Sequence, residues 1–107
     1  MARVTVDPEC ADEVRRVRRL IRERLGVEAA TVFGEAMANV REHGADARAE
    51  LRLHGAGFEV HNMARGSFHR ETDKPSGEGG YGLSIMERMG ATLDTSRRHC
   101  CVRWRKR

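Results

Sequence analysis

Apolar residues recur every three or four positions in three segments of this chain, which is the spacing of one face of a helix. The first segment ends before Gly26, the second covers about residues 28–44, and the third covers about residues 83–89. Gly26, Gly44 and Gly90 close the predicted helices, because glycine is strongly favoured just after a helix C-terminus. The apolar faces of the first two helices contain Val14, Val17, Ile21, Leu25, Val32, Phe33, Ala36, Met37 and Val40.

Other short segments alternate between apolar and polar positions, or are rich in β-branched residues, and are predicted to be strands. They cover residues 3–6, 48–53, 58–62, 93–96 and 100–104. Gly55-Ala56-Gly57 joins two of them into a hairpin, and Arg97-Arg98 joins the last two. The order β-α-α-β-β-α-β-β predicts an α+β fold, a two-layer α/β sandwich with about three helices on one face of a mostly antiparallel mixed sheet. Residues 1–107 are expected to form a single domain.

Composition and charge exclude few partners. The 107 residues carry a formal net charge of +4, which is compatible with nucleic acid, a membrane or an acidic protein. Aromatic residues make up only 5%, which disfavours a surface that stacks nucleic-acid bases. The arginines of the first helix and of residues 103–107 are more typical of a solvated surface than of a docking surface. Nucleic acid is therefore an unfavoured partner.

The cysteines and the lack of a long apolar run indicate the compartment. Cys10, Cys100 and Cys101 are an odd set, and neighbouring cysteines are poor disulfide partners. No segment is apolar over the roughly 20 residues that a membrane span needs, and no secretory signal is recognisable. We therefore expect a cytoplasmic protein with no membrane partner.

The second predicted helix carries a row of polar side chains beside its apolar face. Glu35, Asn39 and His43 occur at positions i, i+4 and i+8, so their side chains stack along one stripe of the helix. A carboxylate, an amide and an imidazole in line are unusual next to a core face, and they indicate a candidate site. For His43, a partly buried structural histidine is an equally good interpretation.

A glycine-rich segment, residues 76–83, runs directly into the third predicted helix. Glycines let the backbone approach a ligand closely, and a helix N-terminus offers free N–H groups, so together they favour a phosphate site. Gly77, Gly79 and Gly82 fit G-x-G-x-x-G, but no predicted strand leads into them, and no Gly-Lys-Ser/Thr of a P-loop is present. The segment ends a polar loop over about residues 63–81, whose length is typical of a functional lid or of disorder. A loop that only caps the helix is the alternative.

Together, the Glu-x-x-x-Asn helix, the hairpin, the glycine-bearing loop and the Gly-x-Gly-Leu start of a helix resemble the GHKL ATPase superfamily. That group includes gyrase B, MutL and histidine kinases. The small size and the run Glu35-Ala36-x-x-Asn39-x-x-x-His43 look most like the anti-sigma-factor serine/threonine kinases of bacteria. The resemblance covers nearly the whole chain and implies ATP and Mg²⁺ as cofactors.

The resemblance implies a role for each matching residue. Asn39 matches the asparagine that holds Mg²⁺ against the ATP phosphates, and Glu35 matches the catalytic glutamate that orients or deprotonates the attacking hydroxyl. Gly80, Gly82 and Leu83 match the segment whose backbone N–H groups receive phosphate. The complete nucleotide-binding set implied is Asn39, His43, Asn62, Ala64, Gly66, Gly77, Gly79, Gly80, Gly82, Leu83 and Cys100.

The departures from the family pattern concern the adenine side of the site. The family places an aspartate at the end of the central strand, where its carboxylate accepts a hydrogen bond from the adenine amino group. Asn62 stands there, Ala64 replaces a glycine, and Cys100 stands where a threonine is common. A charged acceptor bond is worth about 1.5–3 kcal/mol and a neutral one about 1 kcal/mol, so the affinity is expected to fall about tenfold.

Two functions follow as alternatives. One is an ATP-dependent kinase that binds a sigma factor and phosphorylates an anti-sigma antagonist. The other is a nucleotide-weakened GHKL-like module that regulates a partner protein stoichiometrically without catalysis. A homodimer is compatible with either. A zinc site drawn from His61, His69, His99, Cys100 and Cys101 is disfavoured, because no pair has a zinc-ligand spacing such as Cys-x-x-Cys.

Overall fold

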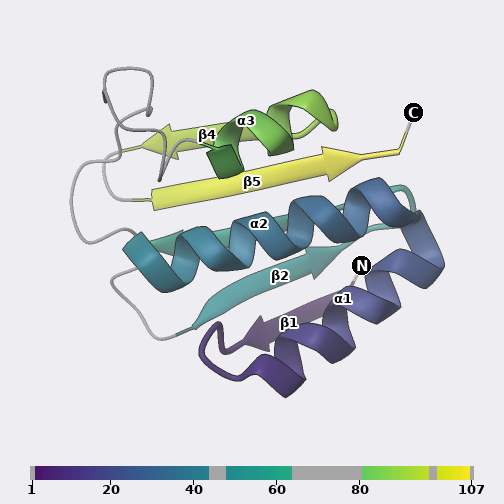
Figure 1. Cartoon of the computed structure of the whole chain (residues 1–107), viewed down its shortest axis with the longest axis horizontal. Helices are drawn as coiled ribbons and strands as arrows, with labels where there is room; N and C mark the ends of the chain where they lie inside the picture. The colour runs from purple at the N-terminus through teal and green to yellow at the C-terminus, as the bar shows by residue number, and fades with distance from the viewer. Residues whose placement is uncertain (1, 44–47, 64–80, 97–98, 107) are drawn as a thin grey trace.

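The computed structural model of the chain describes residues 2–43, 48–63, 81–96 and 99–106. In chain order its elements are β1 (Ala2–Val6), α1 (Ala11–Leu25), α2 (Val27–His43), β2 (Ala49–Leu53), β3 (Gly57–Met63), α3 (Tyr81–Arg88), β4 (Thr92–Ser96) and β5 (His99–Arg105) (Figure 1). This is the predicted order β-α-α-β-β-α-β-β, and the α+β class is confirmed. The boundaries differ from the predicted ones by one or two residues, the largest difference being that α3 begins at Tyr81.

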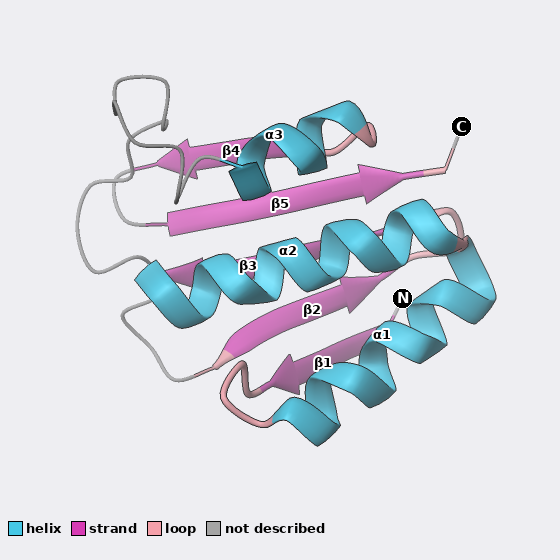
Figure 2. Ribbon diagram, in the orientation of Figure 1, coloured by secondary structure: helices cyan, strands magenta, loops and turns pink. Residues whose placement is uncertain are grey.

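The strands form one five-stranded sheet in the order β1-β2-β3-β5-β4. All four pairings between neighbouring strands are antiparallel, so the described strands contain no parallel pair of the kind that a mixed sheet would have. Figure 2 shows α1, α2 and α3 on the same side of this sheet. Among the described elements, helices cover one face of the sheet and leave the other, the open face, uncovered. The period-2 alternation of strands assigns each side chain to one of these faces.

The two long helices meet at a single glycine. Gly26 has φ +103°, a backbone conformation that L side chains rarely adopt, and its N–H donates to the carbonyl oxygen of Arg22 (2.9 Å). This closes α1 and lets α2 begin at once with Val27. The sharp turn places α1 and α2 side by side over the sheet (Figure 1).

The core lies between α2 and the central strands. Phe33 of α2 and Phe58 of β3 meet edge to face with ring centroids 6.2 Å apart, and Phe58 stacks on Trp104 of β5 at the same distance. The indole Nε1 of Trp104 donates to the carbonyl oxygen of Met89, 2.8 Å away, just after α3. One aromatic row therefore connects α2, β3, β5 and the end of α3.

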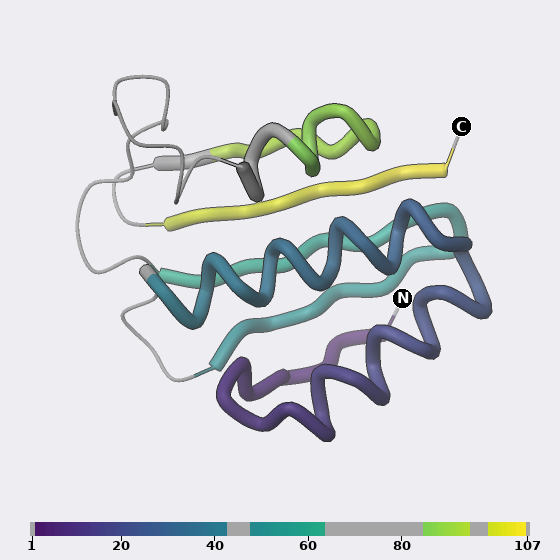
Figure 3. Tube along the Cα trace, in the orientation of Figure 1, coloured from purple at the N-terminus to yellow at the C-terminus, as the bar shows by residue number. Residues whose placement is uncertain are grey.

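The path of the chain brings several element ends to one side of the molecule. In Figure 3, α2 lies along β3 and finishes at the same end of the sheet at which β3 ends and β5 begins. The predicted lid over about residues 63–81 lies outside the described residues except at its two ends. Among the described residues, no helix is both long enough and apolar enough to cross a lipid bilayer.

Candidate functional site

Glu35 and Asn39 lie on the flank of α2 that faces away from α1. The opposite flank is covered, because Arg18 of α1 lies against Gly34 and its Nε donates to the carbonyl oxygen of Ala30 (3.3 Å). A helix turns by about 100° per residue, so Glu35 and Asn39 lie about 140° and about 180° around α2 from Ala30. Since α2 lies between α1 and α3 (Figure 1), the side with Glu35 and Asn39 is the one toward α3.

Both side chains are half-buried, and neither has a partner within the described part of the chain. Among the described residues, neither the Glu35 carboxylate nor the Asn39 amide makes a side-chain hydrogen bond or an ion pair. Polar groups at this depth normally bond to protein, ordered water or a ligand. They are therefore available to a cation or to a substrate hydroxyl. His43, the third member of the predicted row, is the last residue of α2, and its side chain lies outside the described part of the chain.

Asn62 and Cys100 are opposite each other on β3 and β5, on the helix-covered face of the sheet. The amide nitrogen of Asn62 donates to the carbonyl oxygen of Met63 (3.3 Å), which leaves the amide oxygen as an acceptor. Cys100 is buried, and this burial raises the pKa of its thiol to about 11. At neutral pH the thiol is therefore protonated and can serve only as a weak hydrogen-bonding group.

The described members of the predicted site lie toward the same end of the sheet. Asn39 is one turn before the end of α2, and Asn62 and Cys100 lie near the end of β3 and the start of β5 (Figure 3). Gly82 and Leu83 belong to the first turn of α3. The predicted positions outside the described residues are Ala64, Gly66, Gly77, Gly79 and Gly80.

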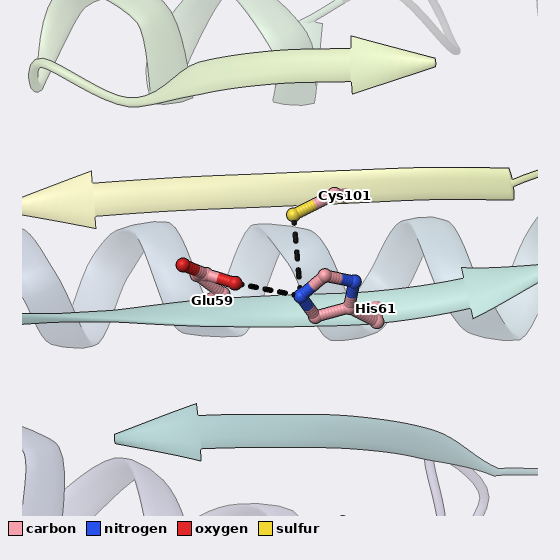
Figure 4. Close-up of side chains that lie close together, drawn as sticks. All are labelled: Glu59, His61 and Cys101. Atoms are coloured by element: carbon pink, nitrogen blue, oxygen red, sulfur yellow. Dashed lines mark hydrogen bonds and ion pairs between the residues drawn. The ribbon is translucent and has the colours of Figure 1, made fainter. Parts of the chain in front are cut away.

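A second group of chemically active side chains lies on the open face of the sheet. Glu59 and His61 are two residues apart on β3, and Cys101 is opposite His61 on β5 (Figure 4). His61 Nε2 lies 2.7 Å from Oε1 of Glu59 and 3.5 Å from Sγ of Cys101. We call these three residues the open-face cluster. It contains two of the residues from the zinc site that the sequence disfavours, His61 and Cys101.

Further groups hold the members of the open-face cluster in place. His61 Nδ1 lies 3.1 Å from Nε2 of His99, and the two rings are tilted against each other. The second carboxylate oxygen of Glu59, Oε2, is 3.2 Å from His54 Nε2 and 3.7 Å from Arg103 Nε. Hydrogen bonds from His61, which has the larger effect, and from His54 lower the pKa of the Glu59 carboxyl. Burial raises the pKa of the Cys101 thiol to about 11.

Glu59 was not among the site residues predicted from the sequence, although the sequence contains a signal for it. The pattern Glu59-x-His61 on a predicted strand does place both side chains on one face, and this signal was available. The addition of Cys101 depends on the register between β3 and β5, which no spacing along the chain reveals.

The basic face of α1 agrees with the expectation of a solvated surface, because its arginines are exposed. They are Arg15, Arg16, Arg18, Arg19, Arg22 and Arg24. Several of them line a hollow of about 390 Å³ between α1 and the start of α2, together with Ala30 and Thr31. This basic hollow lies on the side of α2 that faces α1.

In comparisons with known proteins, no protein-family model matches this chain, and no curated protein matches it by sequence.

Proposed function

We propose that this protein is an ATP- and Mg²⁺-binding regulator of the GHKL type, resembling the anti-sigma-factor serine kinases. In this proposal it binds a sigma factor and phosphorylates a serine or threonine of an antagonist protein. One observation carries it: Glu35 and Asn39 are half-buried and unpartnered among the described residues, on the flank of α2 that faces α3. The kinase family that this chain resembles has a carboxylate and an amide at the positions of Glu35 and Asn39.

The residues of this chain offer the chemical groups that would bind ATP and Mg²⁺. The amide oxygen of Asn39 is a hard donor of the kind that Mg²⁺ accepts, and Mg²⁺ usually takes only one or two ligands from protein. The N–H groups in the first turn of α3, at Gly82 and Leu83, suit phosphate oxygens. The free amide oxygen of Asn62 suits the adenine amino group. Bound ATP with Mg²⁺ would supply the phosphoryl group and the charge neutralisation for its transfer.

Glu35 would act on the acceptor side of the reaction. Its carboxylate lies one turn before Asn39 on the same side of α2, so it would accept the proton of the acceptor hydroxyl as phosphate is transferred. General-base assistance of this kind typically contributes about 10²–10⁴-fold to a rate. Replacing Glu35 should therefore slow transfer about 10²–10⁴-fold while leaving nucleotide affinity nearly unchanged.

Calorimetric titration with ADP and with ATP, each with and without Mg²⁺, tests the nucleotide site. We expect binding that requires Mg²⁺ in the wild-type protein. In Asn39→Ala we expect weak nucleotide binding that Mg²⁺ no longer strengthens. Thr31→Ala is the matched control, since Thr31 lies on α2 and its hydroxyl donates to the carbonyl oxygen of Val27. Absence of any nucleotide signal in the wild-type protein would contradict the proposal.

The alternative, a stoichiometric regulator without catalysis, is favoured by Asn62 and by the buried, protonated Cys100 on the adenine side. Transfer of labelled γ-phosphate from ATP to a candidate antagonist separates the two functions. A kinase loses transfer in Glu35→Ala. A regulator shows no transfer in either protein, and both proteins bind the sigma factor equally.

A further inference from the structure

We propose that the open-face cluster of Glu59, His61 and Cys101 is a binding site for Zn²⁺. The cluster is independent of the proposed nucleotide site, because the two use opposite faces of the sheet. Its three ligand atoms, one oxygen, one nitrogen and one sulfur, lie within 4.8 Å of one another. Zn²⁺ is the common divalent ion that accepts this mixed donor set, whereas Mg²⁺ and Ca²⁺ prefer oxygen ligands only.

The spacing of the nitrogen and sulfur atoms matches that around a tetrahedral zinc ion. With bonds of about 2.0–2.1 Å to nitrogen and about 2.3 Å to sulfur, those two ligands lie about 3.5 Å apart around Zn²⁺. His61 Nε2 and Cys101 Sγ are 3.5 Å apart in this structure. The oxygen and nitrogen ligands should be about 3.3 Å apart, so the 2.7 Å between Glu59 Oε1 and His61 Nε2 must widen by about 0.6 Å. The Glu59 side chain must therefore shift slightly when the ion binds.

His99 is placed to orient His61 for this role. A histidine that binds a metal through one ring nitrogen normally donates the proton of its other nitrogen to a neighbouring acceptor. His61 Nδ1 lies 3.1 Å from His99 Nε2, so a proton on Nδ1 has an acceptor and Nε2 keeps its lone pair for the metal. His99 is therefore a positioning residue rather than a ligand.

The Glu59 carboxylate is also held in place by neighbouring side chains. Glu59 Oε2 is occupied by His54 and Arg103, at 3.2 and 3.7 Å, so Oε1 is the oxygen turned toward His61. Arg103 is in turn paired with Asp94 on β4. All three ligands come from the adjacent strands β3 and β5, whose pairing fixes their separation.

The charges balance when the ion binds. As the Zn–S bond forms, the proton of the Cys101 thiol leaves to solvent. The single proton of the neutral His61 ring moves from Nε2, which donates to Glu59 without the metal, to Nδ1, where His99 Nε2 accepts it. One thiolate, one carboxylate and a neutral imidazole then cancel the two positive charges of the ion. The side chains of His61 and Glu59 are 12% and 21% exposed, so the site is shielded but open enough for a water molecule to complete the tetrahedron.

The test is a zinc titration of the purified full chain against a chromophoric chelator, with Co²⁺ as a spectroscopic substitute. We expect one equivalent of Zn²⁺ per chain, and a Co²⁺ spectrum with tetrahedral and thiolate-to-metal bands. Cys101→Ser and His61→Asn should each weaken binding by at least about 100-fold. His99→Asn should weaken it by about tenfold and keep the thiolate band, because its role is to orient His61.

Two neighbouring thiols provide matched controls. Cys100→Ser removes the adjacent thiol on the other face of β5, and Cys10→Ser removes the more exposed thiol before α1, so both should bind Zn²⁺ like the wild-type protein. Circular dichroism shows whether each variant is folded. If Cys101→Ser is unfolded, the zinc affinities of His61→Asn and Glu59→Gln test the proposal instead. A wild-type chain that binds less than one equivalent overturns the proposal. So does unchanged affinity in His61→Asn, or loss of binding in either control.

Discussion

Cys100 and Cys101 are consecutive residues of β5, and their thiols lie on opposite faces of the sheet. Cys100 is opposite Asn62 on the face that the helices cover, whereas Cys101 is opposite His61 on the open face. A single strand thus contributes neighbouring residues to two unrelated candidate sites. Substitutions one position apart can therefore perturb the two sites separately.

The three cysteines should differ in their reaction with an alkylating reagent. Cys100 and Cys101 are 6% and 1% exposed, and burial raises the pKa of each thiol from 9.0 to about 11. A rise of two pKa units reduces the thiolate fraction at pH 8 about 100-fold, and the thiolate is the reactive form. Mass spectrometry after brief treatment with iodoacetamide should find one adduct, on Cys10. Cys10→Ser should remain unmodified, and rapid labelling of Cys101 would contradict the burial of its thiol.

The same pKa values predict how stability depends on alkaline pH. A thiol whose pKa is higher in the folded state stabilises the fold fully below its unfolded pKa, and this stabilisation is lost as pH rises through the folded pKa. The loss should fall between pH 9 and pH 11, by about 2 kcal/mol for each buried thiol. Urea unfolding of the wild-type protein and of Cys100→Ser across this range isolates one contribution. Parallel pH profiles for the two proteins would count against it.

Two glycines of the β2–β3 hairpin should differ in their response to replacement by alanine. A Cβ at Gly57 would lie 2.2 Å from the carbonyl oxygen of Trp104, a backbone atom that moves only if β3 and β5 separate. We expect Gly57→Ala to lose about 3 kcal/mol of unfolding free energy, because the strain falls beside the Phe58–Trp104 stack. Gly55→Ala, with nothing within 4 Å of its Cβ, should change stability by less than about 0.5 kcal/mol. Fluorescence of the single tryptophan during urea unfolding measures the stability of both variants. Equal losses of unfolding free energy would contradict the close contact at Gly57.

The order of elements could be predicted from sequence because each element carries its own local signal. The apolar period of α2, the glycines after the helices and the alternation in β2 and β3 depend only on residues a few positions apart. The first residue of a helix is harder to predict, since tertiary contacts decide whether the helix extends into a further turn. This is why α3 begins at Tyr81 rather than at Leu83.

Contacts across strands are a different matter. The sheet order places β5 between β3 and β4, and that placement brings Cys101 to His61 from 40 residues away. Sequence spacing favoured no zinc ligand pair, because the usual short-range zinc motifs assume ligands on one turn or knuckle. The polar row on α2 was predictable because its members share one helix. Its relation to Asn62 and Cys100 rested on the family resemblance rather than on any spacing.

Asn62→Asp should tighten adenine-nucleotide binding if the proposed site is used. The Asn62 amide already turns its nitrogen toward the carbonyl oxygen of Met63, which leaves one neutral acceptor oxygen for the ligand. A carboxylate offers a charged acceptor in the same place, and the difference of about 1.4 kcal/mol corresponds to about tenfold in affinity. ADP titration in the presence of Mg²⁺ measures this gain, and Asn62→Ala should instead weaken binding. GDP is the matched control ligand, because its six-position carbonyl offers no amino group to the carboxylate and should be repelled by it. An equal gain for ADP and GDP would mean that residue 62 acts through general charge or stability and does not contact the base.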